Sequence, residues 1–178
     1  KRTSCREFSQ KTLSLNHLSS FLYFSMGQKS LSNPYAGRFY PSAGKRYPIE
    51  IYVISLTTEL EKGIYHYYFK HHSLEKLHTF KDFSFSKHLI HRSFKNASCF
   101  LVMTAIFRRS AIKYNLRCYP FIMMEAGHIG QNIYLVSTAL NLASCAIGGF
   151  NHYKIDEFLD IDGVKETSIY IFALGNRK

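Results

Sequence analysis

Hydrophobic residues recur along the chain with two different spacings, which predict a mixture of helices and strands. In residues 14–26, apolar side chains from Leu15 to Met26 recur three or four positions apart, which is the spacing of one face of a helix. Ser14 is a suitable N-cap for this helix and Gly27 a suitable end. Short runs rich in β-branched and aromatic residues, each bounded by turn residues, predict strands instead. We expect strands at 49–56, 63–70, 74–80, 99–107 and 168–175.

The longest predicted helix, residues 120–142, is apolar on nearly all of its sides. Such a helix belongs at the centre of a protein or at an interface. It is not a membrane span, because polar residues such as Glu125, His128 and Gln131 interrupt it too often. Glu125 and His128 share a face, where we expect hydrogen bonding within a packed interior, since a metal site would need further ligands. Shorter helices are expected at 83–94, 109–116 and 154–161.

The order of these elements favours an α+β fold, because helices and strands follow one another without strict β-α-β alternation. The chain has 178 residues, a length typical of one domain, so we expect a single domain over residues 1–178. With 46% hydrophobic and 20% charged residues, the chain can build a large core and is not expected to be disordered.

Charge and cysteine content narrow the classes of partner. The net charge of +11 is spread along the chain, so it attracts anions in general, and no nucleic-acid-binding motif accompanies it. The four cysteines form no Cys-x-x-Cys pair, so we expect no metal, reduced thiols and a cytoplasmic protein. The sequence begins at Lys1 and not at methionine, so a trimmed or omitted N-terminal extension stays an open alternative.

The N-terminal stretch RTSCREF places Arg2, Ser4 and Arg6 two positions apart. In an extended segment these three side chains point the same way. Two guanidiniums beside a hydroxyl can clamp a phosphate, since arginine binds phosphate through two parallel hydrogen bonds. The alternative is a solvated basic terminus without a ligand.

Two loops contain small residues that let a ligand approach the backbone closely. The loop PSAG, residues 41–44, leads into a predicted strand, and the paired Gly148 and Gly149 follow the long helix. A plain connecting loop and a helix C-cap are the alternatives for these two features.

An amine and a phenol stand side by side at Lys113 and Tyr114. A neighbouring cation favours the charged form of a phenol, so the pair could exchange a proton with a substrate. The alternative, two adjacent surface residues on a short helix, is the commoner arrangement.

Together these motifs resemble one family. RTSCREF, PSAGKRYPIEIYV, KYNLRCYPFIMMEAGHIGQN and CAIGGF occur in the order found in the SagB-type dehydrogenases. These McbC-like azoline oxidases are a branch of the FMN-dependent nitroreductase superfamily, and the resemblance covers essentially the whole chain. It implies an α+β, nitroreductase-like fold whose central, mostly antiparallel sheet is flanked by helices. The long buried helix would lie at a homodimer interface, with FMN bound between the two chains.

The resemblance also implies a role for each motif. The N-terminal arginines and serine, with a basic residue after the last strand, would grip the phosphate and ribityl chain of FMN. The PSAG loop of the partner subunit and the paired glycines would lie against the flavin ring. Tyr114 would remove the ring proton of the substrate, and Lys113 would support its charge. The implied FMN-binding residues are Arg2, Ser4, Arg6, Pro41, Ser42, Ala43, Gly148, Gly149 and Arg177.

The reaction implied by the resemblance is oxidation of a thiazoline or oxazoline to the aromatic azole, on a peptide or a carrier-bound intermediate, with a cyclodehydratase as a partner. FMN would accept a hydride while the ring loses a proton. Two alternatives remain open: an NAD(P)H-dependent nitroreductase or flavin reductase, and a non-catalytic flavin-binding or scaffolding subunit of a biosynthetic complex. Neither a nucleic acid nor a membrane is expected as a partner.

Overall fold

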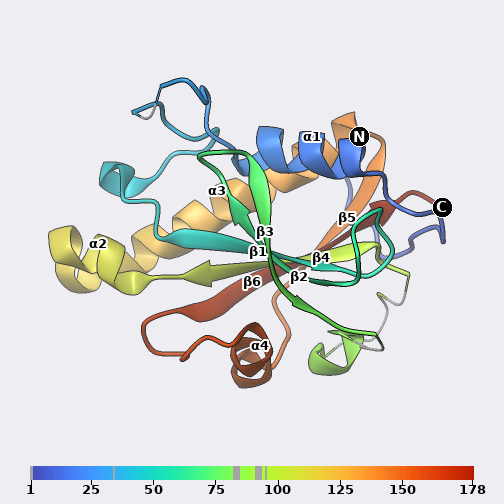
Figure 1. The fold of residues 1–178 in the computed structure, drawn as a ribbon. Helices are drawn as coiled ribbons and strands as arrows, with labels where there is room; N and C mark the ends of the chain where they lie inside the picture. The colour runs from blue at the N-terminus through green and yellow to red at the C-terminus, as the bar shows by residue number, and fades with distance from the viewer. Residues whose placement is uncertain (1, 34, 82–84, 91–93, 95) are drawn as a thin grey trace.

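The computed structural model describes all residues except 1, 34, 82–84, 91–93 and 95, and the described residues form one six-stranded sheet with helices on both faces (Figure 1). The strands are β1 (Ile49–Ser55), β2 (Gly63–Tyr68), β3 (Ser73–Thr79), β4 (Cys99–Ala105), β5 (Leu142–Ile147) and β6 (Thr167–Asn176). The helices are α1 (Leu15–Met26), α2 (Phe107–Tyr114), α3 (Cys118–Ala139) and α4 (His152–Leu159). The strands follow the order β3-β2-β1-β4-β6-β5, and every neighbouring pair is antiparallel. The predicted α+β fold with a central antiparallel sheet is confirmed.

Strand β5 differs from the prediction, which extends the long helix to residue 142 and expects a loop after it. Helix α3 ends instead at Ala139, and Asn141 adopts the left-handed conformation with a φ of 56°. Asparagine tolerates this conformation better than most residues, so it reverses the chain here. The following run LASCAI then pairs along its whole length with β6. Its small residues lack the β-branched and aromatic enrichment that marks the other strands, which hides it in the sequence.

One further stretch differs from the prediction. The helix expected at 83–94 falls partly on residues 83–84 and 91–93, which lie outside the described residues. Between these gaps the chain forms a 3-10 turn, Phe85–His88, in place of a longer helix.

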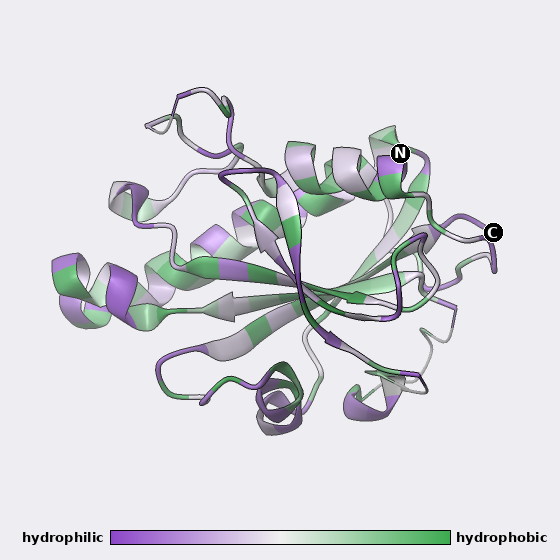
Figure 2. Cartoon of the chain, in the orientation of Figure 1, coloured by the Kyte–Doolittle hydropathy of each residue, from purple (hydrophilic) through white to green (hydrophobic). Residues whose placement is uncertain are grey.

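Side chains pack against both faces of the sheet. Helices α1 and α3 cover one face, where Phe21 and Ile129 of the helices pack with Phe172 of the sheet. Helix α4 lies on the other face and contributes Ile155 to a second core. Every residue of β4 is buried, as its uninterrupted apolar sequence predicts. Figure 2 shows the hydrophobic colour concentrated in the strands and the hydrophilic colour in the peripheral turns. Among the described helices, none is long and apolar enough to cross a membrane.

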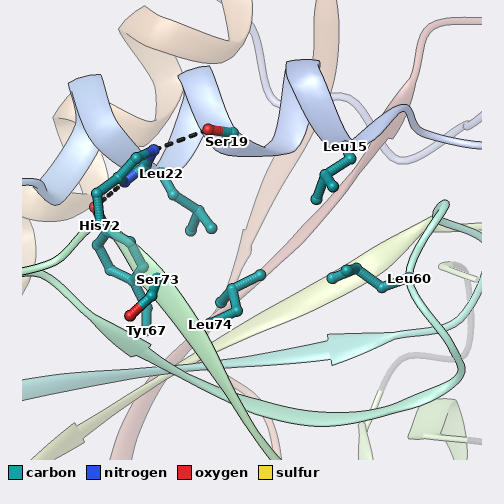
Figure 3. A pocket seen from close by; sticks show the side chains of 8 residues that line it. All are labelled: Leu15, Ser19, Leu22, Leu60, Tyr67, His72, Ser73 and Leu74. Carbon is teal, nitrogen blue, oxygen red and sulfur yellow. Dashed lines mark hydrogen bonds between the residues drawn. The ribbon is translucent and has the colours of Figure 1, made fainter.

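A chain of three hydrogen-bonded side chains fastens α1 to the turn between β2 and β3 (Figure 3). Ser19 Oγ lies 2.8 Å from His72 Nε2, and Tyr67 Oη lies 2.8 Å from His72 Nδ1. Burial lowers the pKa of His72, so its imidazole is mainly neutral at pH 7 and can donate from one nitrogen and accept at the other. The three residues border a cavity of about 310 Å³, whose remaining walls are mainly leucines.

Replacing His72 with asparagine should destabilise the protein by an amount that depends on pH. The substitution removes two hydrogen bonds, so we expect a loss of about 1–2 kcal/mol in the free energy of unfolding well above pH 7. Asparagine is compatible with the φ of 48° at this position. The pKa of His72 in the folded state lies below its ordinary 6.5. The contribution of His72 to the free energy of unfolding is therefore fully present above pH 6.5 and is lost as the pH falls through the pKa of the folded state.

Urea unfolding of the wild type and of His72→Asn, between about pH 5 and pH 8, measures this difference. The neighbouring exposed residue His71, changed to asparagine, is the matched control. A stability difference that stays constant over this pH range contradicts the role assigned to His72.

Candidate functional site

The N-terminal segment lies along strand β5, which is one of the two edge strands of the sheet. The backbone N–H of Cys5 donates to the carbonyl of Ser144 at 2.9 Å. Cys5 is partly buried, whereas Arg2, Ser4 and Arg6 are exposed. The three residues predicted to bind phosphate are therefore accessible to a ligand, and their common orientation stays a prediction.

Tyr134 of α3 connects this segment to β5. Its hydroxyl lies 2.9 Å from Ser4 Oγ and accepts a hydrogen bond from the backbone N–H of Ala146 at 2.9 Å. The guanidinium of Arg2 lies 5.2 Å from the centre of the tyrosine ring, which is a cation–π distance. Nothing in the apolar sequence around Tyr134 distinguishes it in advance, so the sequence analysis misses this residue.

Arginines lie at several positions along β5. We call Arg2, Arg6 and Arg177 the basic strip. Arg6 lies near Cys145, where its charge opposes the rise in the thiol's pKa that burial causes. At the beginning of β5, Nε of Arg177 donates to the carbonyl of Leu142 at 3.2 Å. With a strand rise of about 3.3 Å per residue, Leu142 beside Arg177 and Gly148 lie about 20 Å apart along this edge of the sheet.

The two glycines after β5 have different surroundings. A side chain added at Gly148 would meet nothing within 4 Å, whereas one at Gly149 would lie 3.2 Å from Ile90. Gly148 also lines a hollow of about 500 Å³ together with Phe107 and Met123. Gly148 therefore leaves its backbone open to a ligand, while Gly149 packs closely against Ile90.

The loop 41–44 forms a second cluster with Lys113 and Tyr114. Ser42 Oγ accepts a hydrogen bond from the backbone N–H of Tyr47 at 2.9 Å. Gly44 has a φ of 59°, and a side chain added there would lie 2.6 Å from Tyr114 Oη and 2.9 Å from Lys113 Nζ. The ammonium of Lys113 lies 5.4 Å from the centre of the Tyr114 ring. The amine and the phenol are therefore held against this loop, although they are distant from it in sequence.

The structure does not join these two clusters within one chain. Ser42 lies beside Glu125 of α3, whereas Ser4 lies beside Tyr134 of the same helix. Nine residues of helix separate Glu125 from Tyr134, which corresponds to about 13 Å along its axis. Within one chain the two clusters therefore lie at separate positions along α3.

Glu125 is buried beneath the loop 41–44. Its side chain is 2% exposed, and among the described residues nothing forms a hydrogen bond with its Oε1. Burial raises the pKa of Glu125 to about 7, against the opposing effects of the Ser42 hydroxyl and the Arg38 charge. His128, which shares its helix, is exposed. The predicted structural role of these two residues, hydrogen bonding within a packed interior, is therefore not supported for His128 and is incomplete for Glu125.

Arg38 is a further buried residue that the sequence analysis misses. Its guanidinium donates to Tyr40 Oη at 2.6 Å and lies 3.5 Å from the centre of the Phe69 ring and 4.6 Å from that of Tyr47. It is 6% exposed, and its Nε has no hydrogen-bond partner among the described residues. The only signal in the sequence is one arginine followed by aromatic residues in a polar loop.

The described residues include no group of three or more His, Cys, Asp or Glu side chains placed to hold a metal ion. The side chains that do gather are guanidiniums, hydroxyls, a phenol and an ammonium. This set suits an organic ligand with an anionic group and a proton to exchange.

Comparison with known proteins places the chain in a family. The sequence profile of the Nitroreductase family matches residues 1–176. The nitroreductase-type protein MJ1384 of Methanocaldococcus jannaschii is 31% identical over 183 residues, covering 99% of this chain and 88% of that protein.

Two proteins named as processing proteins are more distant relatives. The trifolitoxin-processing protein TfxB of Rhizobium leguminosarum is 26% identical over 91% of this chain, and the microcin B17-processing protein McbC of Escherichia coli is 28% identical over 70% of it. The matched regions make up 47% and 49% of those two proteins, so this chain corresponds to about half of each.

Solved structures show the same fold. The E. coli microcin synthetase McbBCD complex contains a chain that superposes with a TM-score of 0.87 at 24% identity, over 96% of this chain and 67% of that one. A nitroreductase-type protein from Ralstonia eutropha superposes with a TM-score of 0.82 at 25% identity, over 99% of this chain and 80% of that one. The chain belongs to the nitroreductase family.

Proposed function

We propose that residues 1–178 form one FMN-binding domain that oxidises a thiazoline or oxazoline ring to the aromatic azole. The observation that carries this proposal is the placement of Lys113 and Tyr114 against the loop 41–44. Similarity to McbC and TfxB supports it, because both are named as processing proteins of peptides. The substrate would be an azoline on a peptide or on a carrier, delivered by a cyclodehydratase partner.

The residues along β5 fit the shape and charge of FMN, which members of this family typically bind. Arg2, Arg6 and Arg177 supply three guanidiniums at the edge of β5 for a phosphate, and the Ser4 hydroxyl supplies a donor for the ribityl chain. Gly148 leaves open backbone for a flat ring. In this arrangement Gly149 keeps the backbone in place by packing and does not contact the ring directly.

An exposed stripe on α3 supports a homodimer. Met124 and Leu135 are 52% and 51% exposed, although they lie on a helix that is otherwise deeply packed. Exposed apolar residues in such a stripe indicate a surface that another chain covers. We propose that two copies of α3 pack together here, so that Pro41, Ser42 and Ala43 of one chain line the flavin ring held by the other. The exposed residues of the stripe are Pro120, Met124, Gly127, His128, Gln131 and Leu135.

When bound, FMN would supply a two-electron acceptor. Tyr114 would take the proton that the substrate ring loses, through its Oη at the loop 41–44. The ammonium of Lys113 would stabilise the negative charge on that oxygen, because it lies over the tyrosine ring. Since the phenol and the loop belong to one cluster, the proton acceptor would come from the chain that does not grip the phosphate.

The main rival is an NAD(P)H-dependent nitroreductase or flavin reductase. The similarity to MJ1384 favours it, because that match spans 88% of the relative. The superposition with a chain of the McbBCD complex favours a role within an assembly, which includes the possibility of a subunit without turnover of its own.

Anaerobic mixing of the FMN-loaded protein with a thiazoline peptide separates these functions. We expect the flavin absorbance to bleach without NAD(P)H, and Tyr114→Phe to slow this by about 100-fold or more, as loss of a proton acceptor does. The exposed Tyr35, changed to phenylalanine, is the control and should have no effect. Bleaching by NAD(P)H together with none by azolines would favour the nitroreductase, and no bleaching by either would favour the scaffolding role.

Complementation between two inactive variants tests whether both chains build each site. Arg6→Ala removes the phosphate grip of a chain, and Tyr114→Phe removes its proton acceptor. In a mixed dimer one site carries both defects and the other carries neither, so random mixing should restore about a quarter of the wild-type activity. Activity that stays at the level of the separate variants would show that each chain builds its site alone.

A further inference from the structure

The buried carboxyl of Glu125 borders the candidate flavin site through the hydroxyl of Ser42. Glu125 is 2% exposed, and its carboxyl lies close enough to the Ser42 hydroxyl for that hydroxyl to lower its pKa, while its Oε1 is without a hydrogen-bond partner among the described residues. A buried polar atom without a partner is costly and rare in folded proteins. This carboxyl therefore needs an explanation beyond packing.

The hydroxyl of Ser42 can form only a limited number of hydrogen bonds. A serine hydroxyl carries one proton and two lone pairs. The backbone N–H of Tyr47 occupies one lone pair at 2.9 Å. The second lone pair and the single proton are left for Glu125 on one side and for a ligand on the other.

We propose that Glu125 stores a proton for the flavin site and passes it through the Ser42 hydroxyl. This inference rests on the proposed function, because it takes FMN as the ligand that Ser42 faces. It assigns a positioning role to Glu125, which lies too deep to touch the ligand itself. The motif EAGHIGQN on α3 thereby gains a chemical role for its first residue.

The two protonation states of Glu125 orient Ser42 differently. A neutral Glu125 donates its proton to the free lone pair of Ser42, which leaves the serine proton for an acceptor on the ligand. An ionised Glu125 accepts the serine proton instead, and the ligand loses its donor. In the transfer itself, the proton of Glu125 moves to the serine oxygen while the serine proton moves to the ligand. Glu125 is left as a carboxylate and regains a proton from water, so no electrons are exchanged.

The charged surroundings keep both states accessible near neutral pH. Arg38 and Tyr40 face Glu125 from the loop between α1 and β1, and Glu50 of β1 acts on Tyr40 from below. Burial raises the pKa of Glu125 to about 7, and the nearby Arg38 charge limits that rise. Lys113 borders the same loop at Gly44.

The first test needs no flavin. Side-chain carboxyl NMR of ¹³C-labelled apoprotein should show one glutamate that titrates near pH 7 in place of the ordinary 4.5. Its signal should disappear in Glu125→Gln and remain in Glu157→Gln, a control on the exposed side of α4. In Ser42→Ala, which removes the hydroxyl that favours the carboxylate, the titration should move to higher pH. A titration of Glu125 near pH 4.5 would overturn the proposal, whatever the chain does with FMN.

The second test uses the FMN-loaded protein. The absorbance of bound FMN should change with pH around a midpoint near 7, and this step should be absent from Glu125→Gln and from Ser42→Ala. Glu157→Gln should keep it. A step that persists in both Glu125→Gln and Ser42→Ala would contradict the relay while leaving FMN binding intact. Failure of the wild type to bind FMN would overturn the proposed function and the relay together, and the NMR titration would still report Glu125 separately. If Glu125→Gln does not fold, Ser42→Ala alone decides the second test.

Discussion

The packing of α3 across one face of the sheet is the constraint on which the rest of the structure depends. One side of this helix closes the core through residues such as Ile129 and Ile133, which are fully buried. The same helix carries Glu125 to the loop 41–44 and Tyr134 to the edge of β5. Because a helix is rigid along its axis, these two positions are held apart at a set spacing. The two clusters of candidate site residues are therefore placed by one element, at two separate positions.

This placement is consistent with the proposed division of the candidate site between two chains. The basic strip on β5 contains groups that bind an anion, and the loop with Lys113 and Tyr114 contains groups that exchange a proton. The exposed stripe of α3 provides the surface through which a second chain would bring them together.

Much of the fold follows from the sequence, because helical spacing of apolar residues marks α1, a long apolar run marks α3, and β-branched and aromatic runs mark most of the strands other than β5. Strand β5 escapes prediction because LASCAI is made of small residues, and only the pairing with β6 decides its conformation. The site motifs can be found from RTSCREF, the PSAG loop and the Lys113-Tyr114 pair. Their grouping cannot, since it depends on contacts such as Gly44 with Tyr114 between residues far apart in sequence. Arg38 and Tyr134 escape for the same reason, because their importance lies in tertiary packing.

The loop 41–44 lies between two buried charges that have no ion-pair partner among the described residues. Arg38 is stabilised by the faces of aromatic rings and by one hydrogen bond to Tyr40. Glu125 has fewer contacts that would stabilise a charge, so burial favours its neutral form. A structural core would be more stable with apolar residues at both positions. Their presence beneath this loop is consistent with a role in the chemistry at its surface.

Native mass spectrometry of the protein reconstituted with FMN is the most direct test of a site shared between two chains. The account predicts a dimer that carries two FMN molecules, and it predicts that the flavin is lost when the dimer dissociates, because half of each site leaves with the other chain. A monomer that retains one FMN with the affinity of the dimer would contradict it.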